Sequence, residues 1–382
     1  MIVDPNGRDP REFGDELLAS PSPQRCPVAR TSSGEVLVAG HAEVVEVATS
    51  PEQFSSGVSA HLQLPNGLDG EEHARYRALI DAYLAPAVVD RHGEAFRRIA
   101  REVVEQGLAG DNGRVDAVFD IGARFAVRAM TEWLGWPDEL EDRLIGWVVA
   151  NSRATRSGDP ARTAAVAAEF DEIIGEVVRP RQEEPDAFDD VTAELVHDTS
   201  LGRALEFPEI VSVLRNWTGG DLGSMALSIG VILRGLAQDP ALQERLRKGV
   251  SRTEFTAIAD ELLRRDNPFV SNRRVTTCPV TVGGVELPEG QRVRIHWTAA
   301  NRDPARFPDP DGFDPAGNAA HNLVWGTGPH YCPGKALSML ELQALVEELL
   351  ALAAVAPSAD PAVRSVHPVG GWHSLPVELE RR

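Results

Sequence analysis

Residues 325–334 read Trp-Gly-Thr-Gly-Pro-His-Tyr-Cys-Pro-Gly, and an apolar, helix-like run over residues 335–350 follows directly. Cys332 is one of only three cysteines in 382 residues. It precedes the expected start of a helix, where free N–H groups and the helix dipole favour negative charge. Gly326 and Gly334 let the backbone approach a flat, bulky cofactor and donate N–H groups to sulfur. The stretch therefore favours a thiolate ligand at Cys332.

Two other cofactor sites fit this stretch poorly. A dinucleotide-binding loop requires a third glycine where Tyr331 stands, and it follows a strand early in a βαβ unit. A zinc site at His330 and Cys332 lacks a second pair of ligands in the sequence. A buried structural cysteine, the commonest fate of a lone cysteine, stays open on this stretch alone.

Charge and composition exclude several classes of protein. The formal net charge of −20 argues against a nucleic-acid partner. No uncharged apolar run is long enough to suggest a membrane span, and the first residues lack a signal-peptide core. Three unpatterned cysteines fit a reducing compartment. We expect a cytoplasmic protein without a membrane segment.

Apolar periodicity predicts a mainly α fold with a minor β portion. Helical spacing covers residues 71–84, 89–109, 114–134, 139–152, 160–178, 208–236, 253–265 and 335–353. Strand-like patterns cover 34–40, 275–295 and 366–380, whereas 1–30 and 50–70 look irregular. No linker divides the chain, so we expect a single domain over 1–382. Its helix-rich bulk would span about 70–265 and 335–353, with β-rich parts at about 30–60, 275–296 and 366–380.

Several separated motifs together resemble those of soluble bacterial cytochromes P450. Residues 325–334 match the family pattern Phe-Gly-x-Gly-x-His-x-Cys-x-Gly at every position except the first, which is Trp325. Glu261-Leu-Leu-Arg264 matches Glu-x-x-Arg, and His73-Ala-Arg-Tyr-Arg77 matches His-x-x-x-Arg. The resemblance implies the cytochrome P450 fold, with haem between a long distal helix and the proximal cysteine loop.

The resemblance also implies roles for the matching residues. Cys332 would bind the iron of haem b, with Gly326 and Gly334 shaping the loop around it. The haem propionates would be contacted by His73, Arg77, Arg274 and His330, with Arg273 as an alternative to its neighbour Arg274.

Glu261 and Arg264 would form a buried ion pair on the proximal side. The arginine that completes this brace in the family is replaced here by Gly317. Either the third partner is lost, or Arg302 or Arg306 supplies it.

The distal helix departs from the family pattern around Gly219 and Gly220. The usual acid and alcohol positions hold Leu222 and Gly223. Asp221 and Ser224 flank them and are three residues apart, hence on one helix face. We expect a variant proton relay of Asp221 and Ser224 beside Gly220. The alternative is that Asp221 points to another helix or to solvent while Ser224 only packs.

Family position suggests which residues line the substrate pocket and the partner surface. The predicted substrate contacts are His61, Leu222, Phe269, Val270 and Trp372. No flavin or iron–sulfur motif is present, so electrons would come from an external ferredoxin and its reductase. A basic patch of Lys335, Arg97, Arg98 and Arg101 is the candidate docking surface on a monomeric protein.

The resemblance implies a haem-thiolate oxidoreductase that activates O2. The leading hypothesis is hydroxylation, demethylation or a similar oxidation of an aromatic or specialised small molecule. Oxidative cross-linking of aromatic side chains in a peptide is the alternative. A haem sensor without turnover is a third hypothesis, which the departures around Gly220 motivate.

Overall fold

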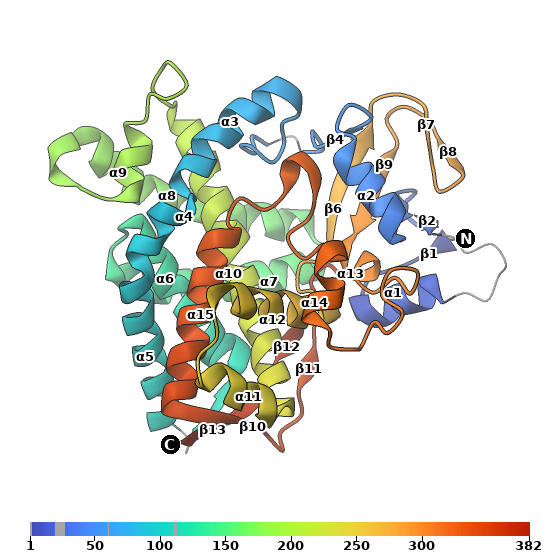
Figure 1. Cartoon of the computed structure of the whole chain (residues 1–382). Coiled ribbons are helices and arrows are strands. Elements are labelled where there is room, and N and C mark those ends of the chain that lie inside the picture. The colour runs from blue at the N-terminus through green and yellow to red at the C-terminus, as the bar shows by residue number, and fades with distance from the viewer. Residues whose placement is uncertain (1, 20–26, 60, 111–112) are drawn as a thin grey trace.

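The computed structural model describes residues 2–19, 27–59, 61–110 and 113–382. Cys26 lies outside the described residues. Figure 1 shows a helix-rich part that contains α10 and α15 and a strand-rich part that contains the N-terminus. The predicted mainly α fold with a minor β portion is confirmed.

The long helix α10, Phe207–Gln238, is the centre of the helical part. It packs against the π-helix η2 (Ala117–Ala123), α6 (Arg124–Leu134), α8 (Pro160–Glu183) and α12 (Arg252–Arg265). A capping box of Glu206 and Glu209, with a proline in the first turn, fixes its start. The helix α15, Lys335–Leu352, begins directly after the cysteine loop and packs along α5, Gly93–Ala109.

Shorter helices complete the helical part and join it to the sheets. They are α1 (Pro10–Leu18), α2 (His41–Thr49), α3 (Gly70–Tyr83), α4 (Pro86–Val89), α7 (Glu141–Ser157), α9 (Val191–Val196), α11 (Pro240–Arg247), α13 (Trp297–Ala300) and α14 (Pro315–Asn318). Five 3-10 turns lie between them: η1 (Asp90–His92), η3 (Asp138–Leu140), η4 (Pro185–Ala187), η5 (Ala319–His321) and η6 (Gly328–His330).

A six-stranded mixed sheet forms the core of the strand-rich part. Its order is β1 (Ile2–Val3), β2 (Val28–Thr31), β3 (Val36–Val38), β9 (Arg292–His296), β6 (Ser271–Thr276) and β4 (Phe54–Ser55). A three-stranded sheet joins β10 (Ala353–Pro357), β13 (Pro376–Arg381) and β5 (Arg114–Asp116). Two hairpins, β7 (Val280–Val282) with β8 (Val285–Leu287) and β11 (Val363–Arg364) with β12 (Trp372–Ser374), complete the strands.

Two sequence predictions of local structure were wrong. Residues 1–30 hold α1 and two strands within the described part, because Asp9 caps the helix and Pro10 starts it. Residues 114–134 begin with β5 and a π-helix before α6. The strand β5 exists because it pairs with β13 more than 250 residues later, which local periodicity does not reveal.

By length and apolar composition alone, α10 also satisfies the criteria for a membrane-spanning helix. Most of its apolar window is buried among the other helices, as expected for a central core helix. The prediction that the chain lacks a membrane segment is consistent with this packing.

Candidate functional site

The cysteine loop is held in one shape by its glycines and by the backbone. Gly326 and Gly328 have φ of 72° and 74°, which disfavours any residue with a side chain. A Cβ on Gly328 would lie 2.5 Å from the Ala48 carbonyl oxygen of α2. The Cys332 N–H donates to the Trp325 carbonyl at 2.9 Å. These contacts fix Cys332 just before α15.

The surroundings of the Cys332 thiol raise its pKa and so disfavour the thiolate unless a cation binds the sulfur. Burial raises its pKa, and the charge of Asp221 raises it further, whereas an N–H bond from Gly334 lowers it. A bound metal cation reverses this balance because it favours the deprotonated sulfur. The residues around Cys332 therefore fit an iron–thiolate bond.

A cluster of two histidines and an arginine lies beside the loop, with Asp69 as a nearby carboxylate. The rings of His73 and His330 are 4.2 Å apart. Burial, Arg274 and His73 lower the pKa of His330 to about 4, and burial lowers that of Arg274. The Arg274 side chain is buried and donates to its neighbour's carbonyl, and His73 Nε2 is buried with no partner.

This cluster fits the two carboxylates of a haem. A buried guanidinium and an orphaned imidazole nitrogen are costly unless an acceptor completes them. His330 Nε2 also lies 3.0 Å from Ser56 Oγ and 3.5 Å from Asp69 Oδ1, so the ring is held in place. His73, Arg274 and His330 are brought together as predicted.

Arg77 supports the cysteine loop from α3. Its Nη1 donates to the Pro329 and Tyr331 carbonyls at 3.0 and 2.7 Å, and its Nε pairs with Asp81 at 2.6 Å. These bonds commit the guanidinium to the cysteine loop. Arg77 therefore supports the loop, and its contact with a haem propionate stays a prediction.

The middle of α10 presents an open face made of glycines. A Cβ placed on Gly219, Gly220 or Gly223 would meet no atom within 4 Å. Ser224 lies on the same side and is half-buried. This open face leaves room for a flat cofactor and a small ligand beside α10, the helix whose Asp221 charge acts on Cys332.

The predicted relay of Asp221 and Ser224 is not formed. Ser224 Oγ donates to the Gly220 and Asp221 backbone carbonyls at 2.6 and 3.3 Å. The Asp221 carboxyl is buried on another side of the helix, where it interacts with Ser338 and Glu341 of α15. The alternative that Asp221 points to another helix is the correct one, because the core packing of α10 sets its rotation.

Asp221 and Glu341 form a buried carboxyl pair that the sequence reasoning missed. Burial raises the pKa of Asp221 to about 7 and raises that of Glu341 well above its usual value, to which the charge of Asp221 adds. Both oxygens of Glu341 and Asp221 Oδ2 lack hydrogen-bond partners among the described residues. The sequence did carry a signal for this pair. Glu341 stands at a core-facing position of the apolar run 335–350, four residues after Leu337.

The proximal brace keeps its ion pair and gains an unexpected partner. Arg264 donates to Glu261 at 2.7 and 3.0 Å, and both side chains are fully buried. The Asn318 amide donates to Glu261 at 2.8 Å, next to the place of the missing arginine at Gly317. Arg302 instead binds Asp15, so it does not complete the brace as suggested.

Comparison with known proteins identifies the family of this site. Residues 162–362, more than half of the chain, match the family described as Cytochrome P450. The chain belongs to the cytochrome P450 family. It is 27% identical to the cyclomarin C epoxidase of Salinispora arenicola, over 78% of each chain. It is 26% identical to the erythromycin C-12 hydroxylase of Saccharopolyspora erythraea, over 86% of this chain and 84% of that protein.

Solved structures agree over nearly the whole length. A mutant of P450 EryK in complex with erythromycin B is 26% identical and superposes with a TM-score of 0.85, covering 97% of each chain. Family membership makes this cytochrome P450 a monooxygenase enzyme. It also implies a haem-iron cofactor, which the residues around Cys332 and Arg274 fit.

The residues predicted to touch substrate divide into two groups. His61 and Phe269 are exposed, and Phe269 forms a bridge to Val369, so both stay candidates. Leu222 and Val270 are each 1% exposed, so they pack into the core rather than line the open face of α10.

Trp372 lies elsewhere than predicted. The Arg234 and Arg364 guanidinium carbons are 5.2 and 4.5 Å from its ring centroid. Arg234 belongs to the C-terminal half of α10, thirteen residues after Asp221 and about 20 Å along the helix axis. Trp372 therefore does not line the open glycine face.

The Arg274→Gln variant is expected to lose haem about 10- to 100-fold more readily than the wild type, because it lacks a partner of the propionates. The apoprotein should be no less stable, since the substitution removes a buried cation that hydrogen-bonds no carboxylate among the described residues. Haem transfer to an acceptor protein measures the first effect and urea unfolding the second. Arg273→Gln is the matched control, because Arg273 is exposed and pairs with Glu35. Equal haem loss in both variants would contradict the assignment.

Proposed function

We propose that this cytochrome P450 inserts oxygen into a specialised-metabolite or aromatic small molecule, by hydroxylation or a similar oxidation. The observation that carries the proposal is the open face of α10 at Gly219, Gly220 and Gly223, on the helix whose Asp221 charge acts on Cys332. Bound haem supplies oxygen activation there, and Cys332 supplies the electron-rich ligand that favours O–O cleavage. Relatives whose names describe epoxidation and hydroxylation of natural products support the substrate class.

Turnover with isotopic oxygen tests this proposal. The haem-loaded enzyme would be supplied with a ferredoxin, its reductase, NADPH and 18O2, and given macrolides and cyclic peptides. A product heavier by one labelled oxygen atom is the expected result. A product lighter by two hydrogens would instead favour oxidative cross-linking, and an unchanged substrate despite bound-state spectral shifts would favour a sensor.

The Asp221–Glu341 pair is proposed as the proton store for this chemistry. Both carboxyls hold protons more firmly than exposed acids do, because burial disfavours their charged forms. Asp221 lies on the helix that carries the open glycine face, one residue after Gly220. When Asp221 gives up its proton, its charge makes Glu341 on α15 hold the remaining proton of the pair more firmly. Asp221 thus takes the acid role, and Ser224 a packing role.

Electrons are proposed to come from a ferredoxin, but the predicted basic patch is largely neutralised. Arg97 and Arg101 pair with Glu347 and Glu348 at 3.3 and 2.8 Å, and Lys335 pairs with Asp260 at 2.9 Å. Arg98 pairs with Glu132 at 3.3 Å. Because every member has a carboxylate partner, a strongly acidic ferredoxin would gain little attraction there.

Asp221→Asn is expected to flatten the pH dependence of stability. The folded-state pKa of Asp221, about 7, lies above the 3.8 of an unperturbed aspartate. The folded state then binds more protons than the unfolded state, so wild-type stability falls as pH rises from about 4 to about 7 and levels off above that. The variant should be more stable at pH 8 by up to about 4 kcal/mol.

Urea unfolding of the haem-loaded protein across this pH range measures the effect. Ser224→Ala is the control, because its hydroxyl bonds backbone carbonyls alone. The same two variants test the proton store, since only Asp221→Asn should lower the fraction of electrons recovered as product. If the stability of Asp221→Asn depends on pH in the same way as that of the wild type, burial does not raise the pKa of Asp221.

A further inference from the structure

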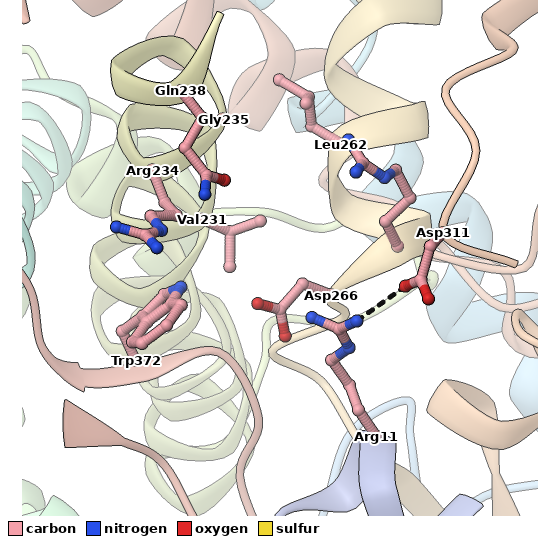
Figure 2. Close-up of a pocket in the computed structure, with 10 residues that line it drawn as sticks. Arg11, Val231, Arg234, Gly235, Gln238, Leu262, Asp266, Asp311 and Trp372 are labelled. Atoms are coloured by element: carbon pink, nitrogen blue, oxygen red, sulfur yellow. Dashed lines mark hydrogen bonds and ion pairs between the residues drawn. The ribbon is translucent and has the colours of Figure 1, made fainter. Parts of the chain in front are cut away.

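A cavity lies at the C-terminal half of α10, away from the cysteine loop. Its volume is about 220 Å³. Figure 2 shows it between α10 and α12, with α1 at one side and Trp372 at another. The residues that line it are Arg11, Val231, Arg234, Gly235, Gln238, Leu262, Arg265, Asp266, Asp311 and Trp372.

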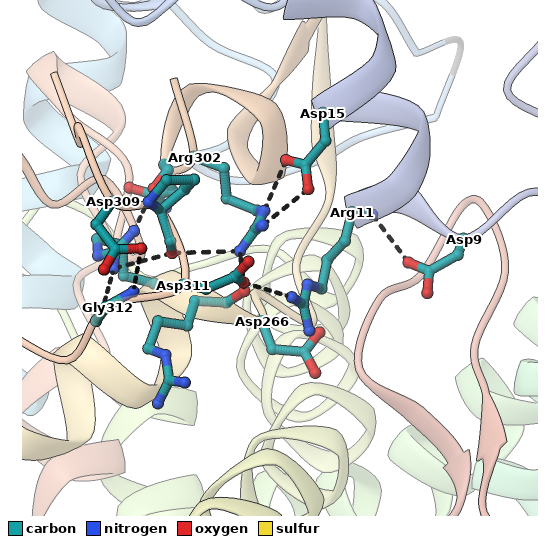
Figure 3. Close-up of polar contacts among 12 residues, drawn as sticks. Asp9, Arg11, Asp15, Asp266, Arg302, Asp309, Asp311 and Gly312 are labelled. Carbon is teal, nitrogen blue, oxygen red and sulfur yellow. Dashed lines mark hydrogen bonds and ion pairs between the residues drawn. The ribbon is translucent and has the colours of Figure 1, made fainter. Parts of the chain in front are cut away.

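The carboxylates of this cavity are already matched by guanidinium groups. Asp266 accepts from Arg364 at 2.5 and 2.9 Å. Asp311 accepts from Arg11 at 2.8 Å and lies 3.0 Å from Arg302 Nη1 (Figure 3). Their negative charge is therefore neutralised inside the protein.

Several N–H donors that line the same cavity lack an acceptor among the described residues. Arg234 and Arg265 are half-buried, and neither forms an ion pair with a carboxylate among the described residues. Arg234 instead lies over the ring of Trp372, whose Nε1 is buried without an acceptor. Arg11 Nε is also buried without an acceptor.

The charge balance at this cavity points to an anion. Its lining holds three arginines and two aspartates. With the outer arginines Arg302 and Arg364 and their further partners Asp15 and Asp9 included, five arginines face four aspartates. The cavity thus carries an excess of positive charge in a chain with a formal net charge of −20. The buried N–H groups of Arg11 Nε and Trp372 Nε1 are costly unless an acceptor completes them.

We propose that this cavity binds a compact oxyanion, with Arg234 and Arg265 as the charged contacts and Trp372 Nε1 as an additional donor. The volume suits an ion the size of phosphate or a short dicarboxylate, and is below the range usual for drug-sized ligands. The anion would join α10 to the end of α12 and to α1. Because it binds the folded state, it stabilises this end of α10 by mass action.

Thermal unfolding of the haem-loaded protein tests the site. Sodium phosphate and sodium succinate would each be titrated against sodium chloride at equal ionic strength. The expected result is a saturable rise in Tm with at least one of the two oxyanions, and which of them acts identifies the ligand class. A Tm that rises linearly with oxyanion concentration, without saturation, would reflect general exclusion of the salt from the protein surface and would overturn the proposal. So would no rise with either ion.

Three variants locate the binding. Arg234→Gln and Arg265→Gln should each weaken the oxyanion at least about tenfold, since each removes a charge-assisted contact. Trp372→Phe keeps the ring beside Arg234 and removes the N–H, so it should weaken binding by a smaller factor. Arg247→Gln, at an exposed arginine paired with Glu244, should bind like the wild type. Equal Tm rises in all variants would place the anion elsewhere and overturn the assignment.

Discussion

Replacement of Cys332 by serine is expected to abolish the red-shifted Soret band of the reduced carbon monoxide complex. Oxidation activity should fall by more than about 100-fold, because substitutions of groups that merely support metal ligands already cost 10- to 100-fold. The reason is chemical rather than steric: serine is nearly isosteric, but its hydroxyl does not provide the electron-rich sulfur that favours O–O cleavage. The carbon monoxide difference spectrum and a turnover assay measure the two effects.

Cys278→Ser is the matched control for this experiment. Cys278 is also a free, partly buried cysteine, but it lies after β6, far from the loop in sequence. It should keep the spectrum and the activity. A retained red-shifted band in Cys332→Ser would show that another residue binds the iron and would end the assignment of the loop.

The cysteine loop was predictable from the sequence because its chemistry is local. The glycines at 326 and 328, which have positive φ, and the helix start after Cys332 are all written into ten consecutive residues. The partners His73 and Arg274 come from distant segments, and their roles followed from the family resemblance. The structure brings both together with His330.

The side to which Asp221 points could not be predicted from spacing. Three-residue spacing places Asp221 and Ser224 near each other on a helix, but it does not say which side of the helix meets which neighbour. Packing of α10 against α15 and η2 sets that rotation, buries Leu222 and turns Asp221 towards Glu341. Tertiary contacts thus decided that the Asp221 carboxyl lies near Glu341 rather than near the Ser224 hydroxyl.

The third partner of the proximal brace was missed for a related reason. Counting along a family pattern assigns one position, Gly317, but a short helix can bring the next residue to the same point. In α14, which Asp314 caps, the Asn318 amide reaches Glu261. A neutral amide here replaces a charged arginine, so the brace buries one cation fewer.

Arg264→Leu is expected to destabilise the folded protein by about 3–5 kcal/mol, because it leaves the fully buried Glu261 without its cation. The Asn301 and Gly312 carbonyls also lose their guanidinium donor, and the Pro310 carbonyl keeps only its bond from Arg302. Urea unfolding of the haem-loaded protein measures the loss. Arg245→Leu removes an exposed arginine that pairs with Glu254 and should cost no more than about 1 kcal/mol.

The double variant Glu261→Leu with Arg264→Leu separates the charge from the packing. If the uncompensated carboxylate dominates, removing it as well should restore part of the lost stability, so the double variant would be more stable than Arg264→Leu alone. Asn318 and the Asp314 N–H would then lose their acceptor, which limits the recovery. A double variant less stable than either single one would show that the brace acts through its hydrogen bonds to the loop before Cys332 rather than through its charges.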